Sequence, residues 1–315
     1  MRLLCPEPGN FSDAVRLRAT ELLDADFRSL GQAEFNAAAP DYDAVLVRFN
    51  TRVGSEVMHP GSRLRAVMSP TTGLDHLDLR LAKRQGVEVF HLRGQTRFLR
   101  TINPTAEMTI ALLLALLRKL PQAWASVLEG RWEVAPFRGH EVAGKTLGIL
   151  GYGRLGSKVA RTAIALQMEV LAYDIRRRRL GAGVRRADSM EQVLRGSDIV
   201  SVHLPLNEET TGILGPRELA LLRPGAILIN TARGALVDTG ALLAGLRSGA
   251  IGGAALDVLT DEHGIVAHGH PLIEYARDHD NILITPHISG ASYESVERTD
   301  MHVFNRFLEW SGIGS

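Results

Sequence analysis

The chain has 315 residues, a nearly balanced charge and a single cysteine. Its 36 basic and 35 acidic side chains leave a net charge of +1, which gives no strong attraction to nucleic acid or to an anionic membrane. Because Cys5 is the only cysteine, an internal disulfide and a zinc site built from several thiolates are excluded. The length is sufficient for two domains, each with a hydrophobic core of its own.

The apolar segments are too short to cross a membrane. The longest unbroken one, 110–117, falls well short of the ~20 residues that a bilayer span requires. Near the N-terminus, Leu3, Leu4 and Cys5 are followed at once by Pro6, which leaves too short a run for the apolar core of a signal peptide. We therefore expect a cytoplasmic protein that binds neither membrane nor nucleic acid.

The first hundred residues alternate predicted strands and helices, as in a parallel α/β unit. Ser12 is a typical N-cap residue for an amphipathic helix that extends to Leu23. A second helix is expected from about Asp75, after a loop at 69–73 that proline and glycine mark. Buried strands are predicted at 44–47, 64–68 and 87–90.

The segment 104–120 is predicted to form one long helix. Pro104 suits its first turn, and Arg118 and Lys119 suit its C-terminal end. Its apolar residues cover nearly the whole circumference, so we do not expect one domain to bury all of them. Two interpretations follow: a linker helix between two domains that also packs against a second subunit, or the central helix of one large domain.

A glycine-rich loop follows the apolar strand predicted at 146–150. Gly151 permits a tight turn, Gly153 lets backbone N–H groups approach a pyrophosphate, and Gly156 allows the next helix to pack closely on the strand. The positive end of that helix would face the phosphates. A second predicted strand ends in Asp174, which would accept hydrogen bonds from the ribose hydroxyls. This βαβ layout predicts a dinucleotide-binding domain.

Further strands, each followed by a polar loop, continue the pattern. They are predicted at 198–204, 226–230, 253–257 and 281–285, and a last helix at 293–310 would return to the first domain. In open parallel sheets, ligands bind beyond the carboxyl ends of the strands. Arg233, Asp257 and His287 lie at such ends, and Glu262 lies in the loop that follows Asp257.

These side chains are suited to the reduction of a 2-oxo acid. The planar guanidinium of Arg233 can anchor the carboxylate or polarise the carbonyl. His287 can supply the proton in reduction and remove it in oxidation, with Glu262 orienting the imidazole and stabilising its charged form. Backbone N–H groups of Thr72 and Gly73 would hold the other end of the substrate carboxylate.

Three histidines, His263, His268 and His270, invite a metal-site interpretation. Their spacing matches no standard ligand motif and they lie in a polar loop, so we expect no metal site. Three other histidines are interpreted as structural: His76, His91 and His203.

Five segments together resemble the D-isomer-specific 2-hydroxyacid dehydrogenase family, in particular its phosphoglycerate dehydrogenase-like members. The resemblance covers most of the chain. The segments are the glycine loop at 144–156, His-Leu-Pro-Leu at 203–206, Asn-Thr-Ala-Arg-Gly at 230–234, Leu-Asp-Val at 256–258 with Glu262, and Thr-Pro-His-Ile at 285–288.

The resemblance implies roles for individual residues. Arg233, Glu262 and His287 correspond to the catalytic residues, and Asp257 corresponds to the residue that holds the nicotinamide carboxamide. The residues implied to bind substrate are Arg48, Thr72, Gly73, Arg233 and His287. The residues implied to bind the cofactor are Gly151, Gly153, Arg154, Leu155, Asp174, His203, Pro205, Thr210, Thr231, Ala232, Asp257, His287 and Gly290.

The resemblance also implies an α/β architecture of two Rossmann-like domains, each with a doubly wound parallel sheet. A flavodoxin-like substrate domain is expected at 1–101 and 290–315, and a dinucleotide-binding domain at 102–289. Family members commonly form homodimers through their cofactor domains, which would cover the apolar helix at 104–120.

Two departures from the family pattern concern the substrate, which is expected to be a small 2-oxo or 2-hydroxy acid. A histidine rather than the usual proline follows Glu262, and the substrate loop keeps only Gly73 of a Gly-x-Gly pattern. Arg48, Arg97 and Arg100 lie near the substrate site by analogy. They predict a substrate with a second anionic group, such as a phosphorylated or phosphono 2-oxo acid.

The cofactor and the activity have alternatives. Asp174 would repel a 2′-phosphate and so favours NAD, while the four arginines at 176–179 leave NADP open. Phosphite dehydrogenase-like relatives keep the same Arg, Glu and His, and a test with phosphite and NAD would distinguish them. The fold also serves in NAD-sensing corepressor-like proteins, which would bind the cofactor tightly and turn over slowly.

Overall fold

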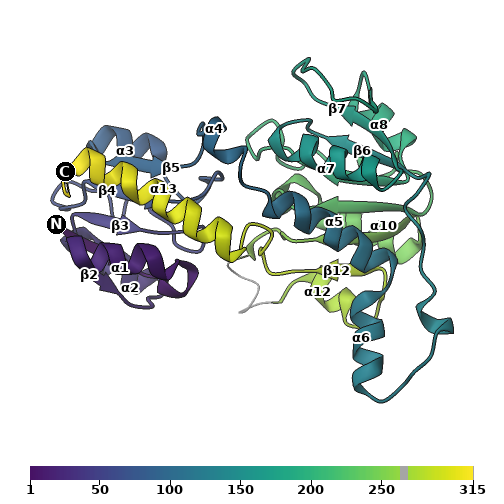
Figure 1. The fold of residues 1–315 in the computed structure, drawn as a ribbon, viewed down its shortest axis with the longest axis horizontal. Helices are drawn as coiled ribbons and strands as arrows, with labels where there is room; N and C mark the ends of the chain where they lie inside the picture. The colour runs from purple at the N-terminus through teal and green to yellow at the C-terminus, as the bar shows by residue number, and fades with distance from the viewer. Residues whose placement is uncertain (263–268, 315) are drawn as a thin grey trace. The chain divides into compact units, whose positions relative to one another are not determined.

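The computed structural model describes residues 1–262 and 269–314. The chain divides into two compact units (Figure 1), Met1–Ile102 with Ala291–Ser315 and Asn103–Gly290. These boundaries lie one residue from the predicted ones. Each unit is built on a parallel sheet with helices, so the α/β class with two Rossmann-like units is confirmed.

The first unit contains a five-stranded sheet in the order β2-β1-β3-β4-β5, which is the flavodoxin-like order. Its strands are β1 (Arg2–Cys5), β2 (Asp24–Phe27), β3 (Ala44–Leu46), β4 (Ala66–Ser69) and β5 (Glu88–His91). All neighbouring pairs are parallel. The central strands β3 and β4 are buried throughout, which explains their continuous apolar sequences.

Helices cover both faces of this sheet, as two separate hydrophobic clusters show. The helices are α1 (Asp13–Leu22), α2 (Gln32–Ala38), α3 (Leu79–Gln85), α4 (Thr96–Leu99) and α13 (Tyr293–Ser311), with 3-10 turns at Pro8–Asn10 and Ala39–Asp41. The Ser12 cap is present, since its hydroxyl accepts a hydrogen bond from Val15 N. Helix α13 packs on α1, β4 and β5, so the predicted return of the last helix to the first unit is confirmed.

The second unit contains a seven-stranded parallel sheet in the order β12-β11-β10-β9-β6-β7-β8. This is the Rossmann order with one further strand at an edge. The strands are β6 (Thr146–Leu150), β7 (Glu169–Tyr173), β8 (Val184–Arg186), β9 (Ile199–Val202), β10 (Ala226–Asn230), β11 (Ile251–Leu256) and β12 (Ile282–Ile284).

The second sheet is also covered on both faces. Its helices are α5 (Pro104–Leu117), α6 (Leu120–Leu128), α7 (Arg154–Ala165), α8 (Met190–Gly196), α9 (Pro216–Leu219), α10 (Thr239–Ser248) and α12 (Pro271–Ala276), with 3-10 turns at Ala135–Phe137 and Gly234–Leu236. One hydrophobic cluster contains α5 and α7, and another contains α8, α9, α10 and α12. The unit is therefore doubly wound.

One predicted helix begins later than expected. Helix α3 starts at Leu79 rather than near Asp75, because the Asp78 side chain caps it by accepting a hydrogen bond from Leu81 N. The residues before the cap form a loop, in which His76 Nε2 lies 3.0 Å from the Ser69 hydroxyl. His76 is thus a structural residue of this loop.

The helix predicted at 104–120 is shorter than expected and is followed by a second helix. Helix α5 ends at Leu117, and Lys119 has a left-handed φ of 49°. Pro121 explains the break, because proline has no N–H to donate to Leu117 O and its ring would clash with that carbonyl in a continuous helix. Helix α6 begins at Leu120, and its axis is bent by 63° from the helical segment before it.

Helix α5 is mostly buried within its own unit. Leu112 is 2% exposed, Leu113 0%, Leu116 8% and Leu117 7%, and the helix contacts α7, β10 and β11. The expectation that one domain does not bury all of these apolar residues is confirmed, because Ala111 is exposed, Leu114 is half-buried and Leu120 is 53% exposed, although most of α5 is buried. Helix α5 begins directly after the boundary between two units, so the alternative of a central helix of one large domain is wrong, and the packing of α5 against a second subunit stays a prediction.

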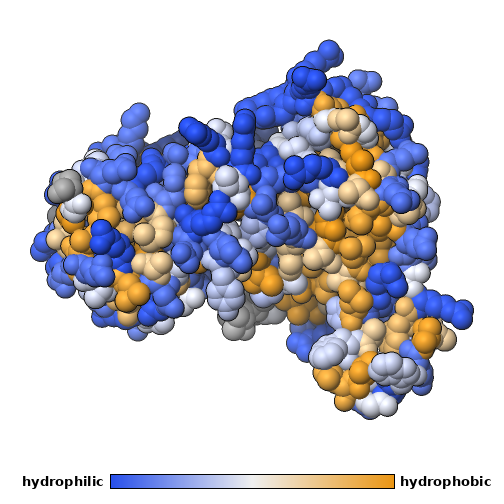
Figure 2. All heavy atoms as spheres, in the orientation of Figure 1, coloured by the Kyte–Doolittle hydropathy of each residue, from blue (hydrophilic) through white to orange (hydrophobic). Residues whose placement is uncertain are grey.

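The large exposed apolar side chains of this region belong to α6 and the segment after it. They are Leu120, Trp124, Val127, Leu128, Trp132 and Val134. Figure 2 shows hydrophobic surface over the part of the molecule that α6 forms. In the described part of the chain, no single helix is long and apolar enough to cross a membrane, and one bent pair, Thr96–Leu117 with Leu120–Leu128, meets the criterion jointly.

Candidate functional site

The predicted cofactor and catalytic residues of the second unit lie in the loops that follow its strands, apart from Arg154 and Leu155, which begin α7. These are the loops after β6, β7, β9, β10, β11 and β12, which are neighbours in one parallel sheet. Because parallel strands end at the same edge, the loops are gathered along that edge. The fold thus brings together residues that are far apart in sequence.

The glycine loop after β6 has the space that a pyrophosphate needs. Gly151 has a φ of +94°, and a Cβ there would lie 2.6 Å from the carbonyl oxygen of His203. A Cβ at Gly156 would lie 2.2 Å from the carbonyl oxygen of Gly151, so neither position accepts a side chain. A Cβ at Gly153 would meet no atom of the described chain within 4 Å. The backbone at the N-terminus of α7 is therefore open to a phosphate group, and the loop fits a dinucleotide.

Asp174, after β7, is fixed beside the glycine loop. Gly151 N donates a hydrogen bond to Tyr173 O at 2.8 Å, which ties the two strand ends together. The Asp174 carboxylate accepts a hydrogen bond from Arg176 N at 2.8 Å and lies 3.6 Å from Arg178 Nε. Its side chain is 11% exposed. A carboxylate in this position suits ribose hydroxyls, and Arg178 places a positive charge next to it.

The loop after β9 contains three predicted cofactor residues and is folded on itself. The Thr210 hydroxyl donates to Pro205 O at 2.6 Å. His203 Nε2 lies 2.9 Å from the Ser201 hydroxyl. Burial lowers the pKa of His203 to about 4, so its imidazole is neutral at pH 7 and is suited to a structural role.

His287 and Glu262 are in direct contact. His287 Nδ1 lies 2.7 Å from Glu262 Oε2, and the two side chains are 18% and 30% exposed. Glu262 Oε1 accepts a hydrogen bond from Leu259 N at 3.1 Å, which fixes the carboxylate in its loop. A carboxylate that engages one imidazole nitrogen orients the ring and sets its tautomer. This is the arrangement that a general acid and base requires.

Asp257 holds the loop that carries His287. Its side chain is buried, and Oδ1 accepts hydrogen bonds from the Thr285 hydroxyl at 2.5 Å and from Ile288 N at 2.9 Å. Oδ2 accepts one from Ser289 N at 2.7 Å. The sequence shows no signal for this bracing role, because it depends on a buried turn. The role predicted for Asp257 toward the nicotinamide stays a prediction.

Arg233 follows β10 in a turn that packs closely on the Glu262 loop. Its Nη1 donates to Ala232 O at 2.7 Å. A Cβ at Gly234 would lie 2.0 Å from the carbonyl carbon of Leu259, so the two loop backbones touch at this glycine. The loops of Arg233 and Glu262 are therefore held side by side.

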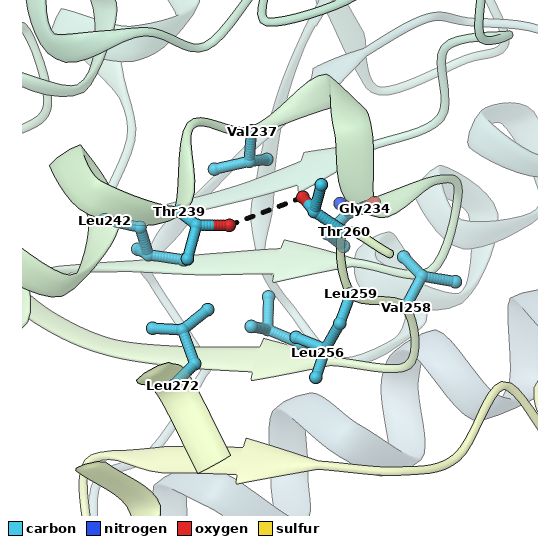
Figure 3. Close-up of a pocket in the computed structure, with 10 residues that line it drawn as sticks. Gly234, Val237, Thr239, Leu242, Leu256, Val258, Leu259, Thr260 and Leu272 are labelled. Carbon is cyan, nitrogen blue, oxygen red and sulfur yellow. Dashed lines mark hydrogen bonds between the residues drawn. The ribbon is translucent and has the colours of Figure 1, made fainter. Parts of the chain in front are cut away.

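A small pocket lies beneath this contact (Figure 3). It is lined by Asn230, Gly234, Val237, Thr239, Leu242, Leu256, Val258, Leu259, Thr260 and Leu272. The hydroxyls of Thr239 and Thr260 lie 3.3 Å apart across it. The lining contains no charged side chain, so it lacks the groups that would bind a carboxylate. It belongs to the packing that supports the two loops.

The remaining predicted cofactor residues also lie at this edge. The Thr231 hydroxyl is 2.9 Å from the Thr109 hydroxyl of α5, which ties the end of β10 to that helix. Arg154 and Leu155 begin α7, and burial lowers the pKa of Arg154. Ala232 precedes Arg233, and Gly290 is the last residue of the unit.

The predicted substrate residues of the first unit lie after β3 and β4. Arg48 Nη2 lies 2.5 Å from Asp300 Oδ1, and the two side chains are 12% and 0% exposed. Its guanidinium is thus engaged by a buried carboxylate, which the sequence pattern does not show. Thr72 and Gly73 lie in the loop after β4, where Thr72 O accepts a hydrogen bond from Arg93 Nε at 3.3 Å. Their contact with a substrate stays a prediction.

Part of the histidine-rich loop lies outside the described residues, namely His263 and His268. His270 is the N-cap of α12, since its Nδ1 accepts a hydrogen bond from Leu272 N at 3.2 Å. This bond gives His270 a structural role. His91 ends β5, where its carbonyl accepts a hydrogen bond from Arg306 Nη1 at 3.0 Å.

Comparison with known proteins agrees with this geometry. Residues 110–289 match the family model described as D-isomer specific 2-hydroxyacid dehydrogenase, NAD binding domain. The chain is 36% identical over 299 residues to a D-3-phosphoglycerate dehydrogenase of Archaeoglobus fulgidus, covering 94% of this chain and 54% of that one. It is 31% identical over 308 residues to a hydroxypyruvate reductase of Thermotoga maritima, covering 96% and 97%. The solved D-lactate dehydrogenase of Aquifex aeolicus, complexed with NAD and lactic acid, superimposes with a TM-score of 0.84 at 26% identity, covering 99% and 96%.

The chain spans about half the length of several curated relatives that it matches, 54% in the Archaeoglobus case, and nearly all of the Thermotoga relative. The matched segment contains the glycine loop, Asp174, Arg233 and the His287–Glu262 pair. The match covers more than half of the chain and agrees with the observed strand order. The chain therefore belongs to the D-isomer specific 2-hydroxyacid dehydrogenase family.

Proposed function

We propose that this protein is an NAD-dependent dehydrogenase that interconverts a D-2-hydroxy acid and the corresponding 2-oxo acid. The observation that carries the proposal is the contact of 2.7 Å between His287 Nδ1 and Glu262 Oε2. This pair lies at the same sheet edge as the glycine loop and Arg233. An acid–base pair, a guanidinium and a dinucleotide loop are the groups that this reaction needs.

The mechanism assigns one task to each side chain. When bound, the nicotinamide supplies the hydride in reduction and accepts it in oxidation. The fork of N–H donors on Arg233 binds the substrate carboxylate. His287 gives a proton from Nε2 to the carbonyl oxygen in reduction, and removes the hydroxyl proton in oxidation. Glu262 binds Nδ1 and stabilises the imidazolium that forms in the oxidation direction.

The proposal extends to the cofactor. Asp174 disfavours a 2′-phosphate by charge repulsion, so NAD is preferred over NADP. Arg178 Nε lies 3.6 Å from the Asp174 carboxylate and partly compensates that charge. NADPH is therefore a slower cofactor rather than an inactive one. Replacing Arg178 with Ala should raise the ratio of kcat/KM for NADH to that for NADPH, and the same change at Arg177 serves as the control.

The proposal also includes a second anionic group on the substrate. The segment after β5 carries Arg93, Arg97 and Arg100, and Arg93 is hydrogen-bonded to the Thr72 loop. Relatives named D-3-phosphoglycerate dehydrogenase are among those most similar to this chain. Arg48 contributes less than the sequence suggests, since Asp300 neutralises it. If glyoxylate, which has a single anionic group, were turned over as fast as any dianionic substrate, the result would contradict the proposed second anionic group.

The decisive test is consumption of NADH, and separately of NADPH, with a panel of 2-oxo acids that includes phosphorylated and phosphono members. Turnover that His287→Ala abolishes, with NADH preferred, is the expected result. Phosphite with NAD is an additional arm of the test. If NAD were reduced in that arm alone, the enzyme would be a phosphite dehydrogenase. Tight NADH binding without turnover in any arm would indicate a cofactor-sensing binding protein instead.

A further inference from the structure

Asn230 is a buried polar residue that the mechanism does not use. It is the last residue of β10, and its side chain is 1% exposed. Its backbone carbonyl accepts a hydrogen bond from Asp257 N at 3.0 Å, so the residue is fixed between neighbouring strands. Burying an amide side chain is unfavourable unless both of its polar ends have partners.

Both ends of the Asn230 side chain are bonded to the turn that follows. Oδ1 accepts a hydrogen bond from Ala232 N at 3.0 Å. Nδ2 donates one to Arg233 O at 2.8 Å. The partners determine the orientation of the amide, because one is an N–H and the other a carbonyl. The side chain thus spans the turn and fixes the backbone on both sides of the Ala232–Arg233 peptide bond.

This peptide is the base from which the Arg233 side chain projects. Arg233 Nη1 donates to Ala232 O at 2.7 Å, so the guanidinium rests on the peptide that lies between the two backbone groups bonded to Asn230. On the far side, Gly234 is packed against the Leu259 backbone. The backbone of Arg233 is therefore constrained on both sides. Asn230 bonds Ala232 N before it and Arg233 O after it, and the next residue, Gly234, is packed against another loop.

We propose that Asn230 is the positioning residue of Arg233, and that it sets the direction from which the guanidinium meets the substrate carboxylate. The inference rests on the proposed function, because it takes Arg233 as the carboxylate anchor. It adds a residue whose effect on substrate binding is transmitted through another side chain. Orientation is the physical basis, since a displacement of about 1 Å in a positioning group reduces rates by roughly 100-fold.

Asparagine is the residue type that this turn requires. Aspartate has the same shape but offers acceptors alone at neutral pH, so it would place a carboxylate oxygen against the Arg233 carbonyl. Serine offers a donor and an acceptor but does not reach both partners. Asn230→Asp is therefore the sharper variant, and Asn230→Ser is the uncharged second variant if the first does not yield folded protein.

The test is a double-mutant cycle between Asn230→Asp and Arg233→Ala, with kcat/KM for the best 2-oxo acid as the readout. In the wild-type background Asn230→Asp should lower kcat/KM by about 10- to 100-fold, mainly through KM, with the NADH dissociation constant unchanged within about twofold. In the Arg233→Ala background the same substitution should change kcat/KM by less than about twofold, because the group that it positions is gone.

The matched control is Asn281→Asp, the same substitution at the opposite end of a strand in the same sheet. Asn281 precedes β12, and its Oδ1 accepts a hydrogen bond from the Tyr275 hydroxyl, which aspartate preserves. The kcat/KM of the Asn281→Asp variant should stay within about twofold of the wild-type value.

Two results would overturn the inference while leaving the proposed function intact. The first is an equal loss of kcat/KM from Asn230→Asp in both backgrounds, and the second is a parallel loss of NADH affinity. A wild-type protein that reduces no 2-oxo acid would instead overturn the proposed function, and the inference with it.

Discussion

At the scale of single residues, His287 has a backbone conformation that few residues with a side chain adopt. Its φ is 55°, in the left-handed region that costs about 1–3 kcal/mol for a residue other than glycine. Asp257 accepts hydrogen bonds from Thr285, Ile288 and Ser289, on both sides of this residue. The buried carboxylate thereby compensates the strain and directs the imidazole toward Glu262.

The first prediction concerns this pair. His287→Ala should lower kcat by roughly 10²- to 10⁴-fold, because the general acid is lost. Glu262→Gln should lower it by a smaller factor, because the imidazole remains but its charged form loses its partner. Steady-state oxidation of NADH measures both, with the NADH dissociation constant as the control for cofactor binding. Full activity of Glu262→Gln would show that the contact is structural.

The second prediction concerns Gly234. Replacement by Ala should lower the free energy of unfolding by about 1–3 kcal/mol, because the added Cβ would meet the carbonyl carbon of Leu259 at 2.0 Å. It should also lower kcat/KM, since Arg233 is the neighbouring residue. Chemical denaturation and kinetics measure the two effects. Gly240→Ala in α10 is the matched control, because its Cβ would meet nothing nearer than 3.4 Å, and a Gly240→Ala variant equally impaired would contradict the explanation.

The sequence indicates the residues that carry out the reaction. It does not indicate the residues whose hydrogen bonds fix those reactive side chains in place. Arg233 and His287 were predictable because each directly follows an apolar strand, and strand ends in parallel sheets share an edge. The bracing roles of Asn230 and Asp257 were not, because they depend on turns whose hydrogen bonds are set by tertiary packing. The engagement of Arg48 by Asp300 joins residues far apart in sequence, so no local pattern reports it.

At the scale of elements, the hydrophobic pattern of the sequence predicted which segments form helices and which form strands. Capping residues and prolines determined where the helices begin and end. Ser12 capped α1 as predicted, since a cap is a short-range signal. Helix α5 ended before its predicted end because of Pro121, a local signal that outweighs apolar periodicity. The burial of α5 depended on the groove between α7 and the sheet, which periodicity alone does not describe.

The third prediction concerns the loop after β9. Burial lowers the pKa of His203 from its ordinary value of 6.5 to about 4, so the unfolded chain binds one more proton than the folded chain between these values. The free energy of unfolding should therefore decrease as the pH falls from about 6.5 to about 4, by at most about 1.4 kcal/mol per pH unit.

Urea denaturation of the wild type and of His203→Gln over this pH range measures the effect. The variant should lose less stability on acidification than the wild type does. Identical pH profiles for the two proteins would mean that His203 titrates normally in the folded state. His59→Gln is the control, because His59 is an exposed histidine of the first unit.

At the scale of the whole molecule, the apolar surface of α6 is the feature that a single chain leaves unexplained. Leu120, Trp124 and Leu128 are 53%, 64% and 67% exposed, and Trp132 beyond the helix is 86% exposed. Clustered apolar surface of this kind marks an interaction site in soluble proteins. We propose that a second copy of the chain covers it, so that the protein is a homodimer through α6 rather than through α5.

The fourth prediction tests this assembly. Replacing Trp124 and Leu128 together with Glu should convert a dimer to a monomer, because charges would be buried at the apolar contact. Sedimentation at micromolar concentration measures the mass. Leu17→Glu, at another exposed leucine (66%) on α1, should leave the mass unchanged. A wild-type protein that sediments as a monomer would contradict the proposal.

The composition of the first unit from two distant parts of the chain has a consequence for biosynthesis. Phe304 and Phe307 of α13 are fully buried in the core beside β1, β3 and β4. A ribosome delivers these side chains only after it has made all of the second unit, which is continuous in sequence. Until then the first unit has strands with an open apolar face, while the second can already fold. The nascent first unit therefore stays incomplete until α13 has been made, and during that time it is the part that needs protection from aggregation.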